Sequence, residues 1–230
     1  MIRRNAITMR GRIERCWLFC FRVEPDRVRG LVPEPLELVT RGGWAFYNVV
    51  VSELSHMRPW FLPRFLGMSY THVAYRLMVR WQAVEGLYFL RSDVDSSLVA
   101  KAGNLLTDFR MHVARVRIGS TPTSIRVEAP GAALEATIFP QGPQLAAGSP
   151  FQSIREAEQF LKYKPAALVR SANGVDVLRI GRNEQDWKSR LARVENGRFE
   201  FLGEPCPPLE LCFEVDTIDY QWNRAERYML

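Results

Sequence analysis

The chain contains 230 residues, of which 47% are hydrophobic and 24% are charged. This composition excludes intrinsic disorder and is typical of a globular protein that is large enough to enclose a cavity as well as a core. No window approaches the roughly 18 uninterrupted apolar residues of a membrane helix, and residues 1–15 lack the apolar segment of a signal peptide. We therefore expect a single domain over residues 1–230, located in the cytoplasm and without a membrane partner.

The 31 basic and 25 acidic residues give a net charge of +6. Arginines recur singly along alternating segments, as at Arg76, Arg80, Arg115 and Arg117, and do not gather beside aromatic residues. This distribution does not match a nucleic-acid-binding surface, so we expect no nucleic-acid partner.

The four cysteines show neither the paired spacing nor the neighbouring histidines of a metal site. Two of them lie four residues apart on a predicted strand and therefore share one of its faces. We interpret the cysteines as buried, reduced thiols. They are Cys16, Cys20, Cys206 and Cys212.

Most of the chain alternates between apolar and polar residues or runs in short apolar stretches, which predicts strands. A short helix is predicted after Pro25 and ends before Pro33. The dipeptides Asn173-Gly174 and Asn196-Gly197 are typical of two-residue hairpin turns. In chain order, the predicted strands cover residues 14–23, 36–40, 44–54, 70–81, 87–91, 109–118, 124–129, 134–139, 166–171, 175–182, 186–194, 198–202 and 209–222.

Two further helices are predicted. Residues 153–156 have the pattern of a capping box, which predicts a helix over Ile154–Tyr163 that Pro165 ends. A shorter helix is expected after the polar residues 95–97, with Gly103 as its stop. A dozen strands with two or three peripheral helices fit a mainly β protein of the α+β type, in which a strongly curved antiparallel sheet forms a cone or barrel. A barrel of this size can hold one small ligand.

Residues 55–68 combine two prolines with large apolar side chains, which predicts an irregular hydrophobic loop. Such a loop covers the mouth of a cavity or forms a contact between subunits. We expect at least two of Trp60, Phe61, Phe65 and Leu66 to be covered in one of these ways. The loop is therefore a candidate contact of a homo-oligomer.

The sequence contains no nucleotide-binding loop, no Ser-His-Asp pattern and no metal-binding spacing, so we expect neither a cofactor nor a metal. The three histidines, His56, His72 and His112, are far apart in the sequence. Separate positions on strands and loops explain them better than a shared metal ion.

Lys101 is the candidate nucleophile. It is the only lysine in the first 161 residues, and it lies among the apolar and small residues 98–103 with no acidic neighbour until Asp108. An amine in apolar surroundings has a lowered pKa and reacts with carbonyl groups. The alternative interpretation is a solvated lysine on a short helix.

The segment Val32-Pro33-Glu34-Pro35-Leu36-Glu37-Leu38 resembles the acetoacetate decarboxylase superfamily, in which an aromatic strand and a short helix precede a similar stretch. The segment Gly86-Leu87-Tyr88-Phe89-Leu90-Arg91-Ser92-Asp93-Val94-Asp95 is similar to an uncharacterised bacterial branch of that superfamily, a domain of unknown function. The resemblance extends over about residues 12–118 and implies the decarboxylase-like barrel with a central cavity.

The resemblance also implies where functional residues would lie. The decarboxylase has two adjacent lysines before a residue and a glycine, and the Lys101-Ala102-Gly103 ending places Lys101 at the second lysine and Ala100 at the Schiff-base lysine. Its carboxylate-binding arginine falls near Glu14, and its two active-site glutamates fall near Tyr47 and near Thr71 or His72. Because these residue types are not retained, the resemblance argues against decarboxylation of acetoacetate.

We therefore expect a protein that binds a small, partly apolar, anionic molecule in a central cavity. Arg76, Arg91 and Arg110 are the candidates for meeting a carboxylate, and Tyr47 and His72 are further candidate binding residues. The alternative is a Schiff-base lyase of the decarboxylase, aldolase or dehydratase type that uses Lys101 on a carbonyl substrate. In a third interpretation, residues 55–68 make the protein chiefly an interaction module.

Overall fold

The structure, a computed structural model, describes residues 4–120, 122–140, 142, 144–162, 164–182 and 188–229. In this part of the chain, 16 strands form one sheet. The strands are β1 (Met9–Val23), β2 (Glu37–Leu38), β3 (Thr40–Arg41), β4 (Trp44–Pro59), β5 (Met68–Trp81), β6 (Val84–Val94), β7 (Met111–Val113), β8 (Arg115–Ser120), β9 (Thr123–Glu128), β10 (Leu134–Phe139), β11 (Ala166–Ser171), β12 (Gly174–Arg182), β13 (Ser189–Phe199), β14 (Leu209–Val215), β15 (Ile218–Trp222) and β16 (Glu226–Met229). The helical segments are α1 (Pro25–Val28), α2 (Ser97–Leu106), α3 (Ile154–Leu161) and the 3-10 turns η1 (Arg29–Leu31), η2 (Arg64–Leu66) and η4 (Glu200–Leu202).

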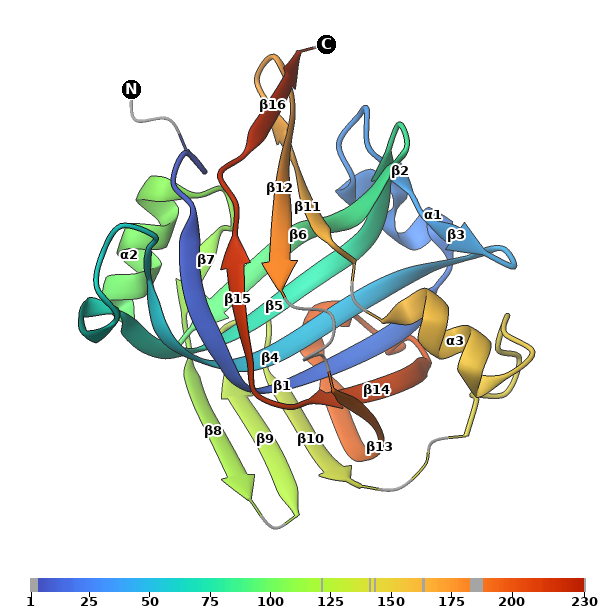
Figure 1. Ribbon diagram of the computed structural model, residues 1–230. Coiled ribbons are helices and arrows are strands. Elements are labelled where there is room, and N and C mark those ends of the chain that lie inside the picture. The colour runs from blue at the N-terminus through green and yellow to red at the C-terminus, as the bar shows by residue number, and fades with distance from the viewer. Residues whose placement is uncertain are drawn as a thin grey trace.

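The sheet is strongly curved, as the alternation pattern predicted. Its strand order is β3-β4-β5-β6-β11-β12-β15-β1-β14-β13-β10-β9-β8, and β4 also pairs with β1. The pairing that runs from β1 through β4, β5, β6, β11, β12 and β15 thus leads back to β1, and these strands surround an interior. Most pairs are antiparallel, but β6 pairs in parallel with β7 and β11, so the sheet is mixed. In Figure 1, α2 and α3 lie on opposite sides of the curved sheet, and β8, β9 and β10 extend away from it.

Strand β5 has the two faces that its alternation predicted. Val73, Tyr75 and Leu77 are fully buried in the larger hydrophobic core. The intervening side chains, from His72 to Met78, face the interior between β1, β4, β5 and β12. This division is required because successive side chains of a strand point to opposite faces.

The prediction of one long strand over residues 109–118 is wrong. The chain pairs first with β6, as β7, and then leaves that edge at the buried Ala114 to pair with β9, as β8. The backbone amide of Ala114 donates to the carbonyl of Val94 at 2.9 Å, which marks the last contact with β6. The apolar positions change phase at this point, from Met111 and Val113 before Ala114 to Val116 and Ile118 after it, so the break left a signal in the sequence that the single-strand prediction overlooked.

Two glycine-based predictions are also corrected. Gly103 does not end α2, which continues to Leu106; the side chain of Met111 packs closely on it, and a Cβ atom at this position would lie 2.1 Å from the Sδ atom of Met111. Asn196-Gly197 is not a hairpin turn but an irregularity inside β13, where the register with β10 shifts and Asn196 has φ = 51°. A residue with a left-handed backbone conformation occurs in β-bulges as well as in hairpin turns.

The predicted capping box of α3 is confirmed. The Ser153 hydroxyl accepts a hydrogen bond from the backbone amide of Glu156 at 3.2 Å, and the Glu156 carboxylate accepts one from the amide of Gln152 at 2.8 Å. The helix spans Ile154–Leu161, and Tyr163, its expected last residue, lies outside the described residues. None of the helices in the described ranges combines the length and the hydropathy needed to cross a membrane.

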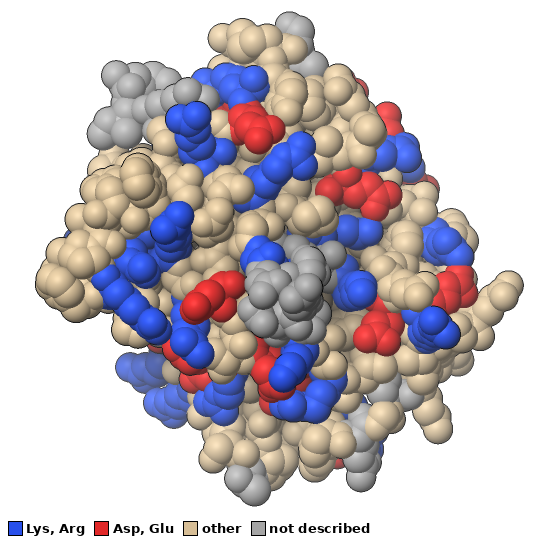
Figure 2. Space-filling view, viewed as in Figure 1, with Lys and Arg blue, Asp and Glu red and all other residues tan. Residues whose placement is uncertain are grey.

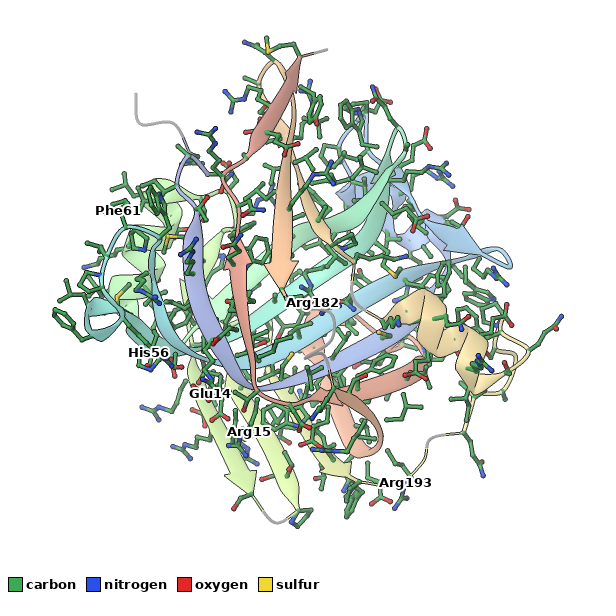
Figure 3. The ribbon with its side chains drawn as sticks, in the orientation of Figure 1. Glu14, Arg15, His56, Phe61, Arg182 and Arg193 are labelled. Atoms are coloured by element: carbon green, nitrogen blue, oxygen red, sulfur yellow. The ribbon has the colours of Figure 1, made fainter. Side chains whose placement is uncertain are left out.

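The segment expected as a loop over residues 55–68 is in part a strand, because β4 continues to Pro59. The rest forms a tight connection through η2, and its apolar side chains point outward; Phe61 lies at the edge of the molecule in Figure 3. The exposed fractions are 57% for Trp60, 60% for Phe61, 82% for Phe65 and 55% for Leu66. The barrel mouth therefore does not cover them, and a second subunit remains the expected cover.

We expect the protein to form a homo-oligomer through Trp60, Phe61, Phe65 and Leu66, because four neighbouring exposed apolar side chains promote association. Phe65→Ser should lower the molar mass measured by light scattering after size exclusion. Leu98→Ser, which removes another exposed apolar side chain, should leave it unchanged. A wild-type chain that elutes as a monomer at micromolar concentration would contradict the prediction.

Candidate functional site

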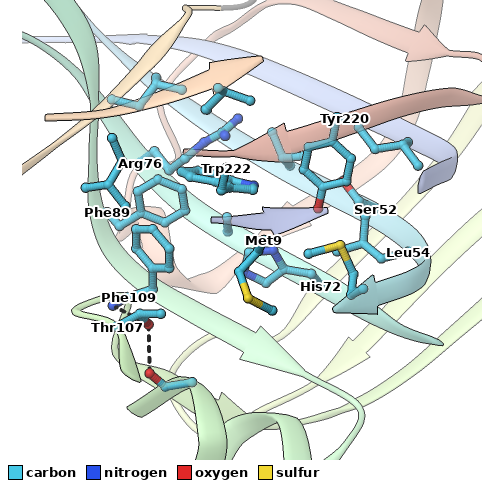
Figure 4. A pocket seen from close by; sticks show the side chains of 18 of the residues that line it. Met9, Ser52, Leu54, His72, Arg76, Phe89, Thr107, Phe109, Tyr220 and Trp222 are labelled. Carbon is cyan, nitrogen blue, oxygen red and sulfur yellow. Dashed lines mark hydrogen bonds between the residues drawn. The ribbon is translucent and has the colours of Figure 1, made fainter. Parts of the chain in front are cut away.

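A cavity of about 570 Å³ lies inside the curved sheet. Residues of β1, β4, β5 and β6 form one wall, and residues of α2, β12 and β15 form the others. Figure 4 shows Arg76 beside Phe89 and Trp222 in this cavity, with Ser52 and His72 further along it. The walls are mostly apolar, and a volume of this size suits one small ligand.

The polar groups of the cavity lie in two rows across the strands. The register pairs Cys16 of β1 with Ser52 of β4, and Ser52 with His72 of β5. A second row begins at Cys20, which is buried behind the cavity wall, and continues through Asn48 to Arg76.

A wholly apolar row separates the two polar rows. It consists of Leu18, Val50 and Ala74. Neighbouring rows are two residues apart along each strand, which corresponds to roughly 6 to 7 Å. The apolar row therefore lies between the two polar rows at about this distance from each.

The orientation of Asn48 is fixed by both of its neighbours. Its Oδ1 atom accepts a hydrogen bond from Nη2 of Arg76, and its Nδ2 atom donates to the Cys20 thiol at 3.6 Å. The Arg76 guanidinium also lies over the ring of Phe89, 5.5 Å from its centre. Burial raises the pKa of Cys20 to about 12, so this thiol stays neutral.

Positive charge predominates on the cavity wall. The wall includes Arg76, Lys164 and Arg182, and no aspartate or glutamate is among its described residues. Burial raises the pKa of the Cys16 thiol, and the charges of Arg76 and Arg182 oppose this shift. The Lys164 ammonium is held at 2.8 Å by Glu85. An anion is therefore the ligand charge that this wall favours.

His72 contributes a neutral imidazole. Burial, and secondarily the charge of Arg76, lower its pKa to about 4. Its Nε2 atom is buried and has no hydrogen-bond partner among the described residues. A buried polar atom without a partner costs free energy, which a ligand that offers a hydrogen bond would recover.

Lys101 is exposed and does not line the cavity, although its neighbours Ala102 and Gly103 do. Ala100, at the position that the resemblance gives to the Schiff-base lysine, is buried against Val94 and Val99. Lys164 is the one lysine on the described wall, and its amino group donates to the Glu85 carboxylate at 2.8 Å. This placement favours binding over imine chemistry.

The other candidate residues are dispersed. Tyr47 faces the larger core on the opposite side of β4, where burial raises its pKa. Arg91 donates to the buried carboxylate of Asp93 at 2.9 Å and to the carbonyl of Pro130. Arg110, with φ = 52°, lines a separate pocket of about 360 Å³. Of the predicted site residues, the structure brings only Arg76 and His72 together in the cavity.

Sequence reasoning missed Ser52, Asn48, Arg182 and Lys164. For the first two a signal was present, because polar residues four apart in an otherwise apolar strand share one face. For Arg182 and Lys164 no local pattern distinguishes them from surface residues. Within the described ranges, no group of three His, Cys, Asp or Glu side chains converges to hold a metal.

Solved structures of the acetoacetate decarboxylase-like class share this fold. The acetoacetate decarboxylase of Legionella pneumophila aligns with a TM-score of 0.69 and 10% identity over 97% of this chain and 88% of its own. An acetoacetate decarboxylase-like enzyme of Sphingomonas wittichii RW1 aligns with a TM-score of 0.60 and 12% identity over 98% and 94%. The enduracididine biosynthesis enzyme MppR aligns with a TM-score of 0.62 and 11% identity over 96% and 88%. At such identities the likeness establishes the fold alone.

Residues 11–202 match the family DUF2071, described as an uncharacterized conserved protein. The chain belongs to this family. No curated protein matches the sequence significantly. The predicted resemblance to the decarboxylase superfamily and to an uncharacterised branch of it is thus confirmed.

The lowered pKa of His72 predicts a pH dependence of stability. The unfolded chain binds a proton to this histidine near its ordinary pKa of about 6.5, whereas the folded chain does so only near 4. Between these values protonation favours the unfolded state, so the free energy of unfolding falls as the pH drops, by up to about 3 kcal/mol.

Urea denaturation at pH 7 and pH 4.5 measures this effect. The loss of stability between the two pH values should be smaller in His72→Gln than in the wild type. His112 is exposed, and His112→Gln is the control. Because His72 is intact in this variant, it should lose as much stability between pH 7 and pH 4.5 as the wild type. Equal losses in the wild type and His72→Gln would show that His72 is not the responsible group.

Proposed function

We propose that the protein binds a small, partly apolar carboxylate in the cavity. The observation that carries the proposal is the wall itself, which is apolar over most of its surface, includes Arg76, Lys164 and Arg182, and has no acidic side chain among its described residues. Guanidinium groups in such a setting form strong charge-assisted hydrogen bonds with carboxylates. The apolar wall accommodates the remainder of the ligand.

The two polar rows give the ligand an orientation. A carboxylate would meet Arg76, next to Asn48, and a second polar group would meet Ser52 and His72 across the apolar row. Neutral His72 suits a carbonyl or hydroxyl group better than a second anion, because an uncharged imidazole adds no countercharge. An oxo or hydroxy carboxylic acid with an apolar body satisfies both positions. A solved structure of MppR contains pyruvate, an oxo acid of this class.

Arg76→Gln should weaken the binding of octanoate and phenylpyruvate, measured by isothermal titration calorimetry, roughly tenfold or more, because a hydrogen bond to a charged group contributes about 1.5 to 3 kcal/mol. Arg80→Gln is the matched control, since Arg80 lies on the same strand but is exposed and paired with Glu37. The amides of the two acids should bind weakly to every variant. Equal affinity for acid and amide in the wild type would exclude recognition of a carboxylate.

We expect no imine to form at Lys101. The side chain of Lys101 is exposed and does not line the cavity in which a carbonyl substrate would be held. Borohydride treatment with acetoacetate, pyruvate and phenylpyruvate, followed by intact mass measurement, should leave the mass of the protein unchanged. An adduct that disappears in Lys101→Ala but not in Lys164→Ala would establish the Schiff-base alternative.

A further inference from the structure

A groove of about 500 Å³ on the outer face of β1, β4 and β15 adjoins the proposed ligand site, with which it shares Arg182 and Tyr220. Met9 and Ile13 face the cavity, so Arg10 and Arg12, at the alternate positions of β1, face outward into the groove. In Figure 2, Lys and Arg side chains gather over this side of the molecule, and Figure 3 labels two lining residues, His56 and Arg182. The arginines that line the groove are Arg10, Arg12, Arg58, Arg64 and Arg182.

The strand register places like charges opposite each other in this groove. Arg10 of β1 is the direct cross-strand partner of Arg58 of β4. Two like charges at such a position destabilise an antiparallel pair unless a counterion lies between them. Among the described lining residues, Asp219 is the only acidic one, and its side chain is 76% exposed.

Backbone carbonyls hold Arg58 in place, whereas Arg12 lies near two carboxylates. Arg58 donates from Nε to the carbonyl of Leu62 at 3.1 Å and from Nη1 to the carbonyl of His56 at 2.9 Å. The guanidinium of Arg12 is 3.7 Å from Glu14 and 3.9 Å from Asp219, and its buried Nε atom has no hydrogen-bond partner among the described residues. Neither Arg58 nor Arg64 has a carboxylate within 4.0 Å in the described ranges.

A backbone irregularity shapes this part of β4. His56 has φ = 54°, and the register of β4 with β5 shifts between Leu54 and Met57. Gly67 packs directly on this point, since a Cβ atom there would lie 2.5 Å from the carbonyl carbon of His56. A bulge of this kind redirects the following side chains, and here it is followed by Arg58, which lies opposite Arg10.

We propose that this groove is a binding site for a phosphate group. A guanidinium group donates two parallel hydrogen bonds to phosphate oxygens, and several guanidinium groups around one concavity can match the multiple negative charge of a phosphate. The phosphate belongs either to a soluble ligand or to the headgroup of an anionic lipid, next to which the exposed Trp60 and Phe61 would lie. The chemistry at the arginines is the same for both sources.

The first experiment measures the melting temperature in phosphate and pyrophosphate, with chloride at matched ionic strength as the reference. Both anions should raise the melting temperature of the wild type and of Arg117→Gln, a control that removes one exposed positive charge elsewhere. They should not raise that of Arg58→Gln. Arg58→Gln removes two hydrogen bonds to backbone carbonyls as well as the repulsion with Arg10, so the shift caused by each anion is measured against the melting temperature of the same variant in chloride. If Arg58→Gln gives no cooperative transition, Arg64→Gln, on the exposed turn η2, takes its place.

The second experiment separates the two sources. Glycerol 3-phosphate and inorganic phosphate are titrated by calorimetry, and vesicles of phosphatidylglycerol with phosphatidylcholine are compared with pure phosphatidylcholine by co-sedimentation. Binding of either the soluble phosphates or the anionic vesicles, weakened at least about tenfold in Arg58→Gln but not in Arg117→Gln, supports the proposal and names the source. If neither the soluble phosphates nor the anionic vesicles bind, or if Arg58→Gln and Arg117→Gln bind them equally, the proposal is overturned. Arg76→Gln should bind phosphate normally, which keeps this result independent of the cavity.

Discussion

Side chains alternate along β1, β4 and β5, so the register among these three strands decides what the interior of the protein contains. Cys20, Asn48 and Arg76 are aligned across them, as are Cys16, Ser52 and His72. A slip of one residue in β5 would turn Arg76 toward the hydrophobic core and Tyr75 into the cavity. The apolar residues on the other face, among them Val73 and Leu77, are fully buried and make such a slip costly.

Arginines and their partners also fix the interior of the sheet. The buried Arg22 is paired with the buried Glu210, and the half-buried Arg91 with the buried Asp93. Each of these two charges is matched by a carboxylate, as burial requires. The half-buried Arg76 donates to the amide of Asn48 and lies over the ring of Phe89, which fixes the direction of its guanidinium on the cavity wall.

The decarboxylase-like fold carries this site without the groups that the resemblance implied. Ala100 is buried where a Schiff-base lysine would be expected, and the only lysine on the described wall is tied to Glu85. Hydrogen-bonding and cationic side chains on the strands have taken the place of a nucleophile on α2. The family thus uses a shared scaffold with a wall of different chemistry, which is the usual relation between a fold and its functions.

The sequence alone determined the strand-rich fold class, the capping box of α3 and the two faces of β5, because alternation and helix-start signals are local properties of the chain. It also indicated Arg76 and His72, which lie on the polar side of a strongly patterned strand. The bulge at Asn196 and the continuation of α2 past Gly103 escaped it, since each depends on which distant strand or side chain packs there. The break at Ala114 is marked only by a one-residue change in the phase of the alternation. Only the tertiary structure placed Arg182 and Lys164 on the cavity wall and Lys101 outside it, because strands that are far apart in sequence converge there and periodicity carries no information about which of them meet.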